Sequence, residues 1–287
     1  MPELPEVEVV KQSLEKYILN KSLLKINVKN KNLRYPVPKN ISRKLSKLKI
    51  LKVKRVSKYI VIEFKSDLFL IIHLGMSGTL HIKKKGKDFV NTNLSFYHSK
   101  NLPKKHNHIS FFFKDFSIIY NDPRRFGFVK IINRKKNLYN YFVKYGPDPF
   151  DNNFNFEYIY KYLSTKKKNI KNTLLDQKFI SGIGNIYASE ILNQSKINPL
   201  KSSGKITKNE IRKIIFYTKK VLNYSIKRGG TTINNFLSIK GIKGTYQKEF
   251  SAYNRENQKC KNISCKGTII RLNISNRSTY KCNFCQK

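Results

Sequence analysis

The sequence predicts an α+β protein in which a strand-rich segment precedes a helical one and a short cysteine-bearing hairpin ends the chain. Three observations predict this class. Short Val- and Ile-rich runs separated by turn residues fill much of residues 22–133. Beyond Gly146-Pro147-Asp148-Pro149, apolar residues recur at helical spacing. All four cysteines lie within the last 28 residues.

The first element expected is a short N-terminal helix. Val7, Val10, Leu14 and Ile18 fall on one face at the three-to-four spacing of a helix. Pro5 stands in the first turn, where a missing N–H costs little. The helix should therefore bury this face.

Strands are expected next. Val- and Ile-rich stretches cover residues 50–64, 69–73, 109–120 and 126–132, and turn clusters such as Gly75-Met76-Ser77-Gly78 separate them. Because no helical pattern intervenes, these strands predict an antiparallel sandwich or barrel.

The second segment is expected to be helical, with helices near 156–163, 170–178 and 185–194. The best-marked helix begins at Thr207, because Glu210 three residues later completes a capping box. Its apolar face is expected to contain Ile211, Ile215, Leu222 and Ile226, with Gly229-Gly230 ending it.

The cysteines predict a metal site. Cys260 and Cys265 are separated from Cys282 and Cys285 by sixteen residues, the spacing of paired knuckles on a β-hairpin that holds one tetrahedral Zn²⁺. Four thiolates leave no open position, so the zinc would be structural. The alternatives are two disulfides, which an intracellular protein disfavours, or unrelated thiols. The hairpin tip, residues 273–277, would project.

Charge points to a polyanionic partner. Lys and Arg number 59 against 17 Asp and Glu, a net charge of +42. An abundance of Lys, Asn and Ile also fits a coding bias, so charge alone does not identify nucleic acid. An apolar fraction of 39% excludes wholesale disorder. Neither a membrane span nor a secretory signal is recognisable, and a soluble cytoplasmic protein is expected.

The N-terminus offers a nucleophile. Removal of Met1 would expose the secondary amine of Pro2, and an α-amino group is deprotonated far more readily than a lysine at neutral pH. Such an amine forms a permanently cationic iminium with a sugar carbon, an electron sink suited to opening the sugar and eliminating phosphate. Glu3 and Glu6 supply carboxylates beside it. The alternative is an ordinary chain start.

Eight collinear motifs carry a family resemblance. They are Met1-Pro-Glu-Leu-Pro-Glu-Val-Glu8, Ser57-Lys58-Tyr59, His73-Leu-Gly-Met-Ser-Gly78, Lys105-His-Asn-His108, Asp122-Pro-Arg-Arg-Phe-Gly127, Gly182-Ile-Gly-Asn-Ile-Tyr-Ala-Ser-Glu190, Gly229-Gly-Thr-Thr232 and the four-cysteine end at Cys285-Gln286. With them the chain resembles the formamidopyrimidine-DNA glycosylases, bacterial repair enzymes for 8-oxoguanine. Leu4 favours this branch over the related endonuclease VIII branch.

The resemblance implies three regions and a monomer. Residues 1–134 would be a catalytic β-sandwich flanked by helices, and 135–258 a helix–two-turn–helix DNA-binding domain that includes a lesion-sensing loop. Residues 259–287 would be a zinc finger.

The resemblance also implies catalytic roles. Pro2 would form a Schiff base at the deoxyribose C1′, and Glu3, supported by Glu6, would be the general acid that opens the sugar ring. Lys58 would act in β-elimination. Arg277 would hold the phosphate beside the lesion and assist δ-elimination.

DNA contacts are implied in the same way. Met76, Arg124 and Phe126 would form a wedge that fills the gap left by an everted base, because apolar side chains can replace a base in the stack and Arg can bond its orphaned partner. The alternative is that Met76 and Phe126 are core residues. The positions expected to contact DNA are His106, Arg124, Lys166 and Asn185.

The function implied is base-excision repair by a bifunctional glycosylase and abasic-site lyase, acting on oxidised purines in duplex DNA. The rivals are a preference for oxidised pyrimidines, a non-catalytic damage-binding protein, and a zinc-ribbon RNA-binding protein that leaves the N-terminal motif unexplained. Two departures from the family stand out: Lys281 replaces an aromatic residue before Cys282, and Gly244-Thr245-Tyr246 alters the lesion loop.

Overall fold

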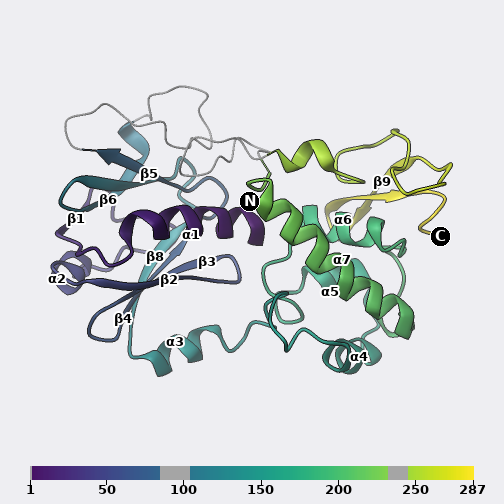
Figure 1. Cartoon of the computed structure of the whole chain (residues 1–287), viewed down its shortest axis with the longest axis horizontal. Coiled ribbons are helices and arrows are strands. Elements are labelled where there is room, and N and C mark those ends of the chain that lie inside the picture. The colour runs from purple at the N-terminus through teal and green to yellow at the C-terminus, as the bar shows by residue number, and fades with distance from the viewer. Residues whose placement is uncertain (1, 85–103, 232–244) are drawn as a thin grey trace. The chain divides into compact units, whose positions relative to one another are not determined.

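The computed structural model of the protein, drawn in Figure 1, describes residues 2–84, 104–231 and 245–287. Its chain divides into two compact units. One unit comprises Met1–Val143 with Ile226–Gln247, and the other comprises Lys144–Ser225 with Lys248–Lys287. Strands dominate the first unit and helices the second, so the α+β class is confirmed. Among the described residues, no helix is long and apolar enough to cross a membrane.

Two antiparallel sheets make up most of the first unit. One sheet has the order β1-β6-β7-β5, with β1 (Lys25–Val28), β6 (Asn107–Phe112), β7 (Phe116–Asn121) and β5 (Thr79–Lys84). The other has the order β2-β3-β4-β8, with β2 (Ile50–Val56), β3 (Tyr59–Phe64), β4 (Leu68–His73) and β8 (Phe128–Asn133). The helices of this part are α1 (Leu4–Ile18), α2 (Ile41–Leu45), α3 (Lys135–Phe142) and the single turn η1 (Lys104–His106).

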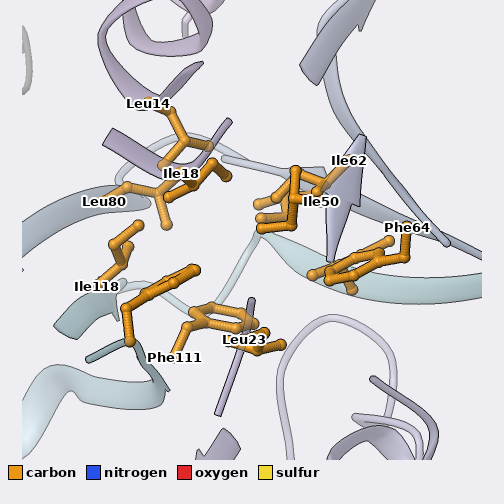
Figure 2. A pocket seen from close by; sticks show the side chains of 12 residues that line it. Leu14, Ile18, Leu23, Ile50, Ile62, Phe64, Leu80, Phe111 and Ile118 are labelled. Atoms are coloured by element: carbon orange, nitrogen blue, oxygen red, sulfur yellow. The ribbon is translucent and has the colours of Figure 1, made fainter. Parts of the chain in front are cut away.

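The core of this unit joins both sheets to α1. The predicted apolar face of α1 (Val7, Val10, Leu14 and Ile18) is buried in it, which confirms the sequence pattern. Figure 2 shows Leu14 and Ile18 meeting side chains from both sheets around an apolar cavity of about 20 Å³. A cavity without polar partners does not retain water, so this one is a small packing void. The interior is therefore that of a β-sandwich with a helix closing it.

Two of the stretches expected to form strands, 50–64 and 109–120, each fold as two strands joined by a turn. The stretch 50–64 divides at Ser57-Lys58, where Ser57 has a φ of 54°, and 109–120 divides after Phe112. Neither turn contains glycine or proline, the strongest turn signals in a sequence. The division places Lys58 at a turn instead of within a strand.

The second unit contains the helices α4 (Phe156–Ser164), α5 (Ile170–Leu175), α6 (Asn185–Gln194) and most of α7 (Lys208–Lys227), with the single turn η2 (Ser203–Lys205). The single turn η3 (Tyr246–Glu249) begins in the first unit and ends in the second. The capping box before α7 is confirmed: the Thr207 N–H donates to Glu210 (2.7 Å) and the Glu210 N–H to the Thr207 hydroxyl (3.3 Å). Helix α5 is shorter than expected, because the backbone becomes extended at Asp176.

The predicted face of α7 is only partly right. Ile211 and Leu222 are buried, whereas Ile215 and Ile226 are half-buried and Ile214 and Val221 belong to the buried face. The helix ends before Gly229-Gly230, both at a φ of 76°, as expected. The chain closes with the antiparallel hairpin of β9 (Ile269–Ile274) and β10 (Arg277–Cys282).

Candidate active site and nucleic-acid interface

The N-terminal residues form a buried acidic cluster. Pro2 is buried, and it is followed by Glu3, the N-cap of α1, and Glu6 in its first turn, which are 4% and 2% exposed. The Glu6 Oε2 accepts the Glu3 N–H at 2.9 Å. The sequence therefore brings two shielded carboxylates to the residue expected to supply the nucleophile.

Glu6 is held on its other oxygen as well. Its Oε1 accepts both the N–H (2.9 Å) and the hydroxyl (3.0 Å) of Thr231. Gly230, at a φ of 76°, brings the chain so close that an added Cβ would lie 3.2 Å from this oxygen. With three hydrogen bonds accepted, Glu6 is suited to fix the backbone of Glu3 in place, and its supporting role in catalysis stays a prediction.

Lys58 occupies the turn between β2 and β3 and is 8% exposed. Arg55 links this turn to α1: its Nε donates to Glu8 at 2.9 Å and its Nη1 to the Ser57 carbonyl at 3.1 Å. The turn is thereby fixed to the helix whose first residues carry the acidic cluster. Sequence reasoning missed Arg55 and Glu8, and no local pattern marks a pair 47 residues apart.

His73 ends β4 near Lys58. Burial, reinforced by the charges of Lys58 and Arg34, lowers the pKa of His73 to about 4. The ring is therefore neutral at neutral pH, and because Nδ1 accepts the Gly75 N–H (3.1 Å), the proton is assigned to Nε2. His73 can donate a hydrogen bond there without adding charge.

The three residues expected to form the wedge lie on two exposed loops. Met76 is 41% and Phe126 42% exposed, so neither belongs to the core. Arg124 is also exposed, and its guanidinium lies 4.6 Å from the centre of the Phe126 ring. Two large apolar side chains facing solvent beside a cation are what insertion into a base stack requires.

An open cleft of about 640 Å³ borders this loop. It is lined by Asn32, Leu33, Arg34, Arg124, Arg125 and Phe126. Three of the six are arginines, so the cleft is strongly basic and can accept phosphate.

His106, Lys166 and Asn185, the other expected DNA contacts, have different surroundings. Burial first, then the charge of Lys105, lowers the pKa of the partly exposed His106. Lys166 follows α4, partly exposed, with its Nζ 4.9 Å from the Tyr162 ring centre. His106 belongs to the first unit, whereas Lys166 and Asn185 belong to the second.

The hairpin tip is fixed to the neighbouring helices. The Ser278 carbonyl accepts Nζ of Lys171 in α5 (3.1 Å) and Nδ2 of Asn185 in α6 (2.9 Å). Asn172 donates to the Ser275 hydroxyl at 2.8 Å. Arg277, adjacent to Ser278, is exposed. The tip thus presents Arg277 from a rigid base, and Lys171, which no sequence pattern singles out, is one of its supports.

Asn185 therefore has a contact that was not anticipated. Its side-chain amide is engaged by the hairpin, and its Oδ1 is buried without a partner among the described residues. It is the first residue of α6, after the N-cap Gly184, and backbone N–H groups at a helix start favour an anion.

The four cysteines can hold a metal. Their Sγ atoms all lie within 4.8 Å of one another, with Cys260–Cys285 at 3.8 Å and Cys265–Cys282 at 3.5 Å. Zn–S bonds of about 2.3 Å in a tetrahedron place sulfurs roughly 3.8 Å apart, and a disulfide would need about 2.05 Å. The donor set and spacing fit Zn²⁺. Further donors point at the sulfurs, among them Nδ2 of Asn262, 3.2 Å from Cys285.

The structure describes one of the two departures from the family motifs, Lys281, in full and the other, Gly244-Thr245-Tyr246, in part. Lys281 donates to the Gln286 carbonyl at 3.0 Å, so it ties β10 to the end of the chain. In the lesion loop, residues 239–244 lie outside the described residues. Beyond them, the N–H of the buried Tyr246 donates to the Gly230 carbonyl at 3.2 Å.

Comparison with known proteins shows the family. The family models for the formamidopyrimidine-DNA glycosylase N-terminal domain and H2TH domain match residues 1–129 and 145–237. Formamidopyrimidine-DNA glycosylases of Wolbachia from Brugia malayi and of Rickettsia bellii are 40% and 34% identical to the chain, with full coverage of both partners.

Solved structures are similar over the same length. A Lactococcus lactis FPG mutant in complex with Fapy-dG-containing DNA has a TM-score of 0.87 at 29% identity, with full coverage of both chains. The MutM complex with DNA containing carbocyclic 8-oxo-G has a TM-score of 0.86 at 30% identity, also with full coverage.

Proposed function

The chain belongs to the formamidopyrimidine-DNA glycosylase family, and from that premise we propose that it removes oxidised purines from duplex DNA and cleaves the strand at the resulting abasic site. The substrates would be 8-oxoguanine and formamidopyrimidine lesions, in base-excision repair. The observation that carries the proposal is the buried pair Glu3 and Glu6 directly beside Pro2.

Pro2 would act as the nucleophile once Met1 has been removed. Its secondary amine would attack C1′ of the damaged nucleotide, and the base would leave as the glycosidic bond breaks. The resulting iminium would be cationic without an added proton, which acidifies the neighbouring C2′ position and prepares elimination of the 3′ phosphate.

Glu3 would protonate the ring oxygen as the sugar opens. A carboxyl this close to the nucleophile suits the role, because a general acid must lie within hydrogen-bond reach of the atom that it protonates. Glu6, bonded to the Glu3 N–H, would position it.

Lys58 and Arg277 would serve the elimination steps. Lys58, held at its turn through Arg55, would contribute to β-elimination. Arg277, on the braced hairpin tip, would bind the phosphate beside the lesion in bidentate fashion and assist δ-elimination. Met76, Arg124 and Phe126 would fill the helix after base eversion, and His106, Lys166 and Asn185 would contact the DNA backbone.

The metal would be one structural Zn²⁺ held by Cys260, Cys265, Cys282 and Cys285. Bound there, it supplies a crosslink between the two ends of the hairpin. The protein would act as a cytoplasmic monomer.

Borohydride trapping tests the proposal. The purified protein is incubated with a duplex carrying 8-oxoguanine opposite cytosine, reduced, and the crosslinked peptide is mapped by mass spectrometry. Crosslinking through the Pro2 nitrogen is expected. A crosslink at a lysine, together with full activity of Pro2→Gly, would contradict the assignment, and stronger trapping on an oxidised pyrimidine would reverse the substrate preference.

A further inference from the structure

We propose that Asp122 is the positioning residue of the wedge: one buried carboxylate that holds the Met76 loop and the Arg124–Phe126 loop in the arrangement needed to enter DNA. The inference rests on the proposed function, since it concerns how that function's wedge is set. Asp122 is 0% exposed and therefore does not itself reach DNA.

The carboxylate bonds to both loops. Its Oδ1 accepts the hydroxyl of Ser77, the residue after Met76. Its Oδ2 accepts the N–H of Gly127, the residue after Phe126, at 2.8 Å, and the Tyr120 hydroxyl at 3.3 Å. The two apolar members of the wedge are each one residue from a group that Asp122 binds.

Ser77 extends the connection to the third member. Its Oγ donates to Asp122 and accepts the N–H of Arg124 at 3.1 Å. The backbone of Asp122 adds a further link, because its carbonyl accepts the Arg125 N–H at 3.2 Å. Asp122 is therefore linked, directly or through Ser77, to Arg124 and to the residues that follow Met76 and Phe126.

Glycines let the two loops touch. A Cβ on Gly75, whose φ is 63°, would overlap the backbone of Gly127, and a Cβ on Gly127 would overlap the Tyr120 hydroxyl. The loops are packed backbone against backbone, so a shift in one must move the other.

The arrangement has an energetic reason. Met76 and Phe126 are 41% and 42% exposed, so burial of these side chains in the core is not what fixes their loops. Ordering flexible loops on DNA would subtract from the energy available for unstacking a base. Hydrogen bonds to a buried charged acceptor are among the stronger ones, and Asp122 receives three.

Asp122→Asn is the informative change. The amide keeps the shape but replaces an acceptor oxygen with a donor group, so the Ser77 hydroxyl or the Gly127 N–H loses its acceptor. We expect excision of 8-oxoguanine from duplex DNA to fall on the order of tenfold or more, the effect of one buried donor left unpaired. Trapping on a single-stranded abasic oligonucleotide should be unchanged, because there is no base stack to open or fill.

Controls separate positioning from general destabilisation. Asp115→Asn makes the same chemical change at an exposed position in the β6–β7 connection and should preserve both reactions. Ser77→Ala removes the hydroxyl that donates to Asp122. It should also slow excision from the duplex, by a smaller factor, and leave trapping on the single-stranded abasic oligonucleotide unchanged. In the double variant Asp122→Asn/Met76→Ala, the rate of 8-oxoguanine excision should fall by less than the product of the two single fold-losses, because both changes act through the wedge.

The outcomes are distinct. Failure of the wild-type protein to trap on either DNA overturns the proposed function, and this inference with it. If the wild type traps but Asp122→Asn loses both reactions equally, or if its loss adds fully to that of Met76→Ala, the positioning role alone is wrong.

Discussion

Glu6 accepts two hydrogen bonds from Thr231, a residue 225 positions further along the chain. Its remaining oxygen accepts the Glu3 N–H. The carboxylate thus joins the first turn of α1 to the chain just beyond α7, with one oxygen on the Glu3 backbone and the other on Thr231.

Glu6→Gln should therefore destabilise the first unit. The amide can accept at one end only, which leaves a buried N–H of Glu3 or Thr231 unpaired at a cost of about 1–3 kcal/mol. Urea unfolding monitored by circular dichroism measures the loss. Glu15→Gln, a matched change further along α1 in a partly exposed pair with Lys11, should cost less than about 1 kcal/mol. Equal losses in the two variants would show that Glu6 contributes no more than a surface carboxylate.

Glu3→Gln should abolish base excision with DNA binding nearly intact. General acid catalysis contributes about 10²–10⁴ in rate, and the amide keeps the size of the side chain without an acidic proton. Single-turnover excision and fluorescence anisotropy on the same 8-oxoguanine duplex measure the two effects. A parallel collapse of binding would mean that the role of Glu3 is structural.

Arg277→Ala should flatten the salt dependence of DNA binding. Loss of one phosphate contact lowers the slope of log affinity against log salt by about one unit. Arg277→Lys should keep the slope but recover strand cleavage only in part, since an ammonium lacks the planar fork of a guanidinium. Arg271→Ala removes the same charge from β9, away from the tip, and should leave the slope unaltered. An unchanged slope and unchanged cleavage in Arg277→Ala would remove the tip from the DNA interface.

Chelation of the metal should weaken DNA binding while most secondary structure survives. The four thiolates organise a terminal hairpin, whereas the sandwich has a core of its own and the helices α6 and α7 bury apolar residues outside that hairpin. Metal analysis should find one zinc per chain, and circular dichroism with anisotropy should follow its removal and return. Global unfolding on chelation, or binding that does not recover with added zinc, would contradict this prediction.

Acid should destabilise the first unit through His81. Burial lowers the pKa of His81 to about 3, against 6.5 for an exposed histidine. Since the unfolded chain gains this proton first, stability is full above pH 6.5 and falls as pH drops toward 3, by about 2 kcal/mol at pH 5. Urea unfolding of the wild type and His81→Gln at pH 7 and pH 5 measures it. The variant should lose less stability between the two pH values, and an equal loss would show that His81 takes up no proton on unfolding.

The features readable from sequence are those in which the interacting residues are close along the chain. The apolar face of α1 follows from apolar residues spaced three and four apart, and the capping box lies within the four residues from Thr207 to Glu210. The cysteine pairs are also readable from the sequence, because each pair lies within a few residues and the hairpin between the pairs brings them together.

The connections that position the site are of another kind. Glu6 with Thr231, Asp122 with Ser77 and Lys171 with Ser278 are separated by 225, 45 and 107 residues. No local repeat encodes such pairs, since they depend on strand register and on turns such as Ser57-Lys58 that carry neither glycine nor proline. The motifs and the resemblance that they carry predict a catalytic N-terminus, a wedge and a metal hairpin. Which buried groups hold those parts in place depends on packing between distant segments, and only the folded chain brings these segments together.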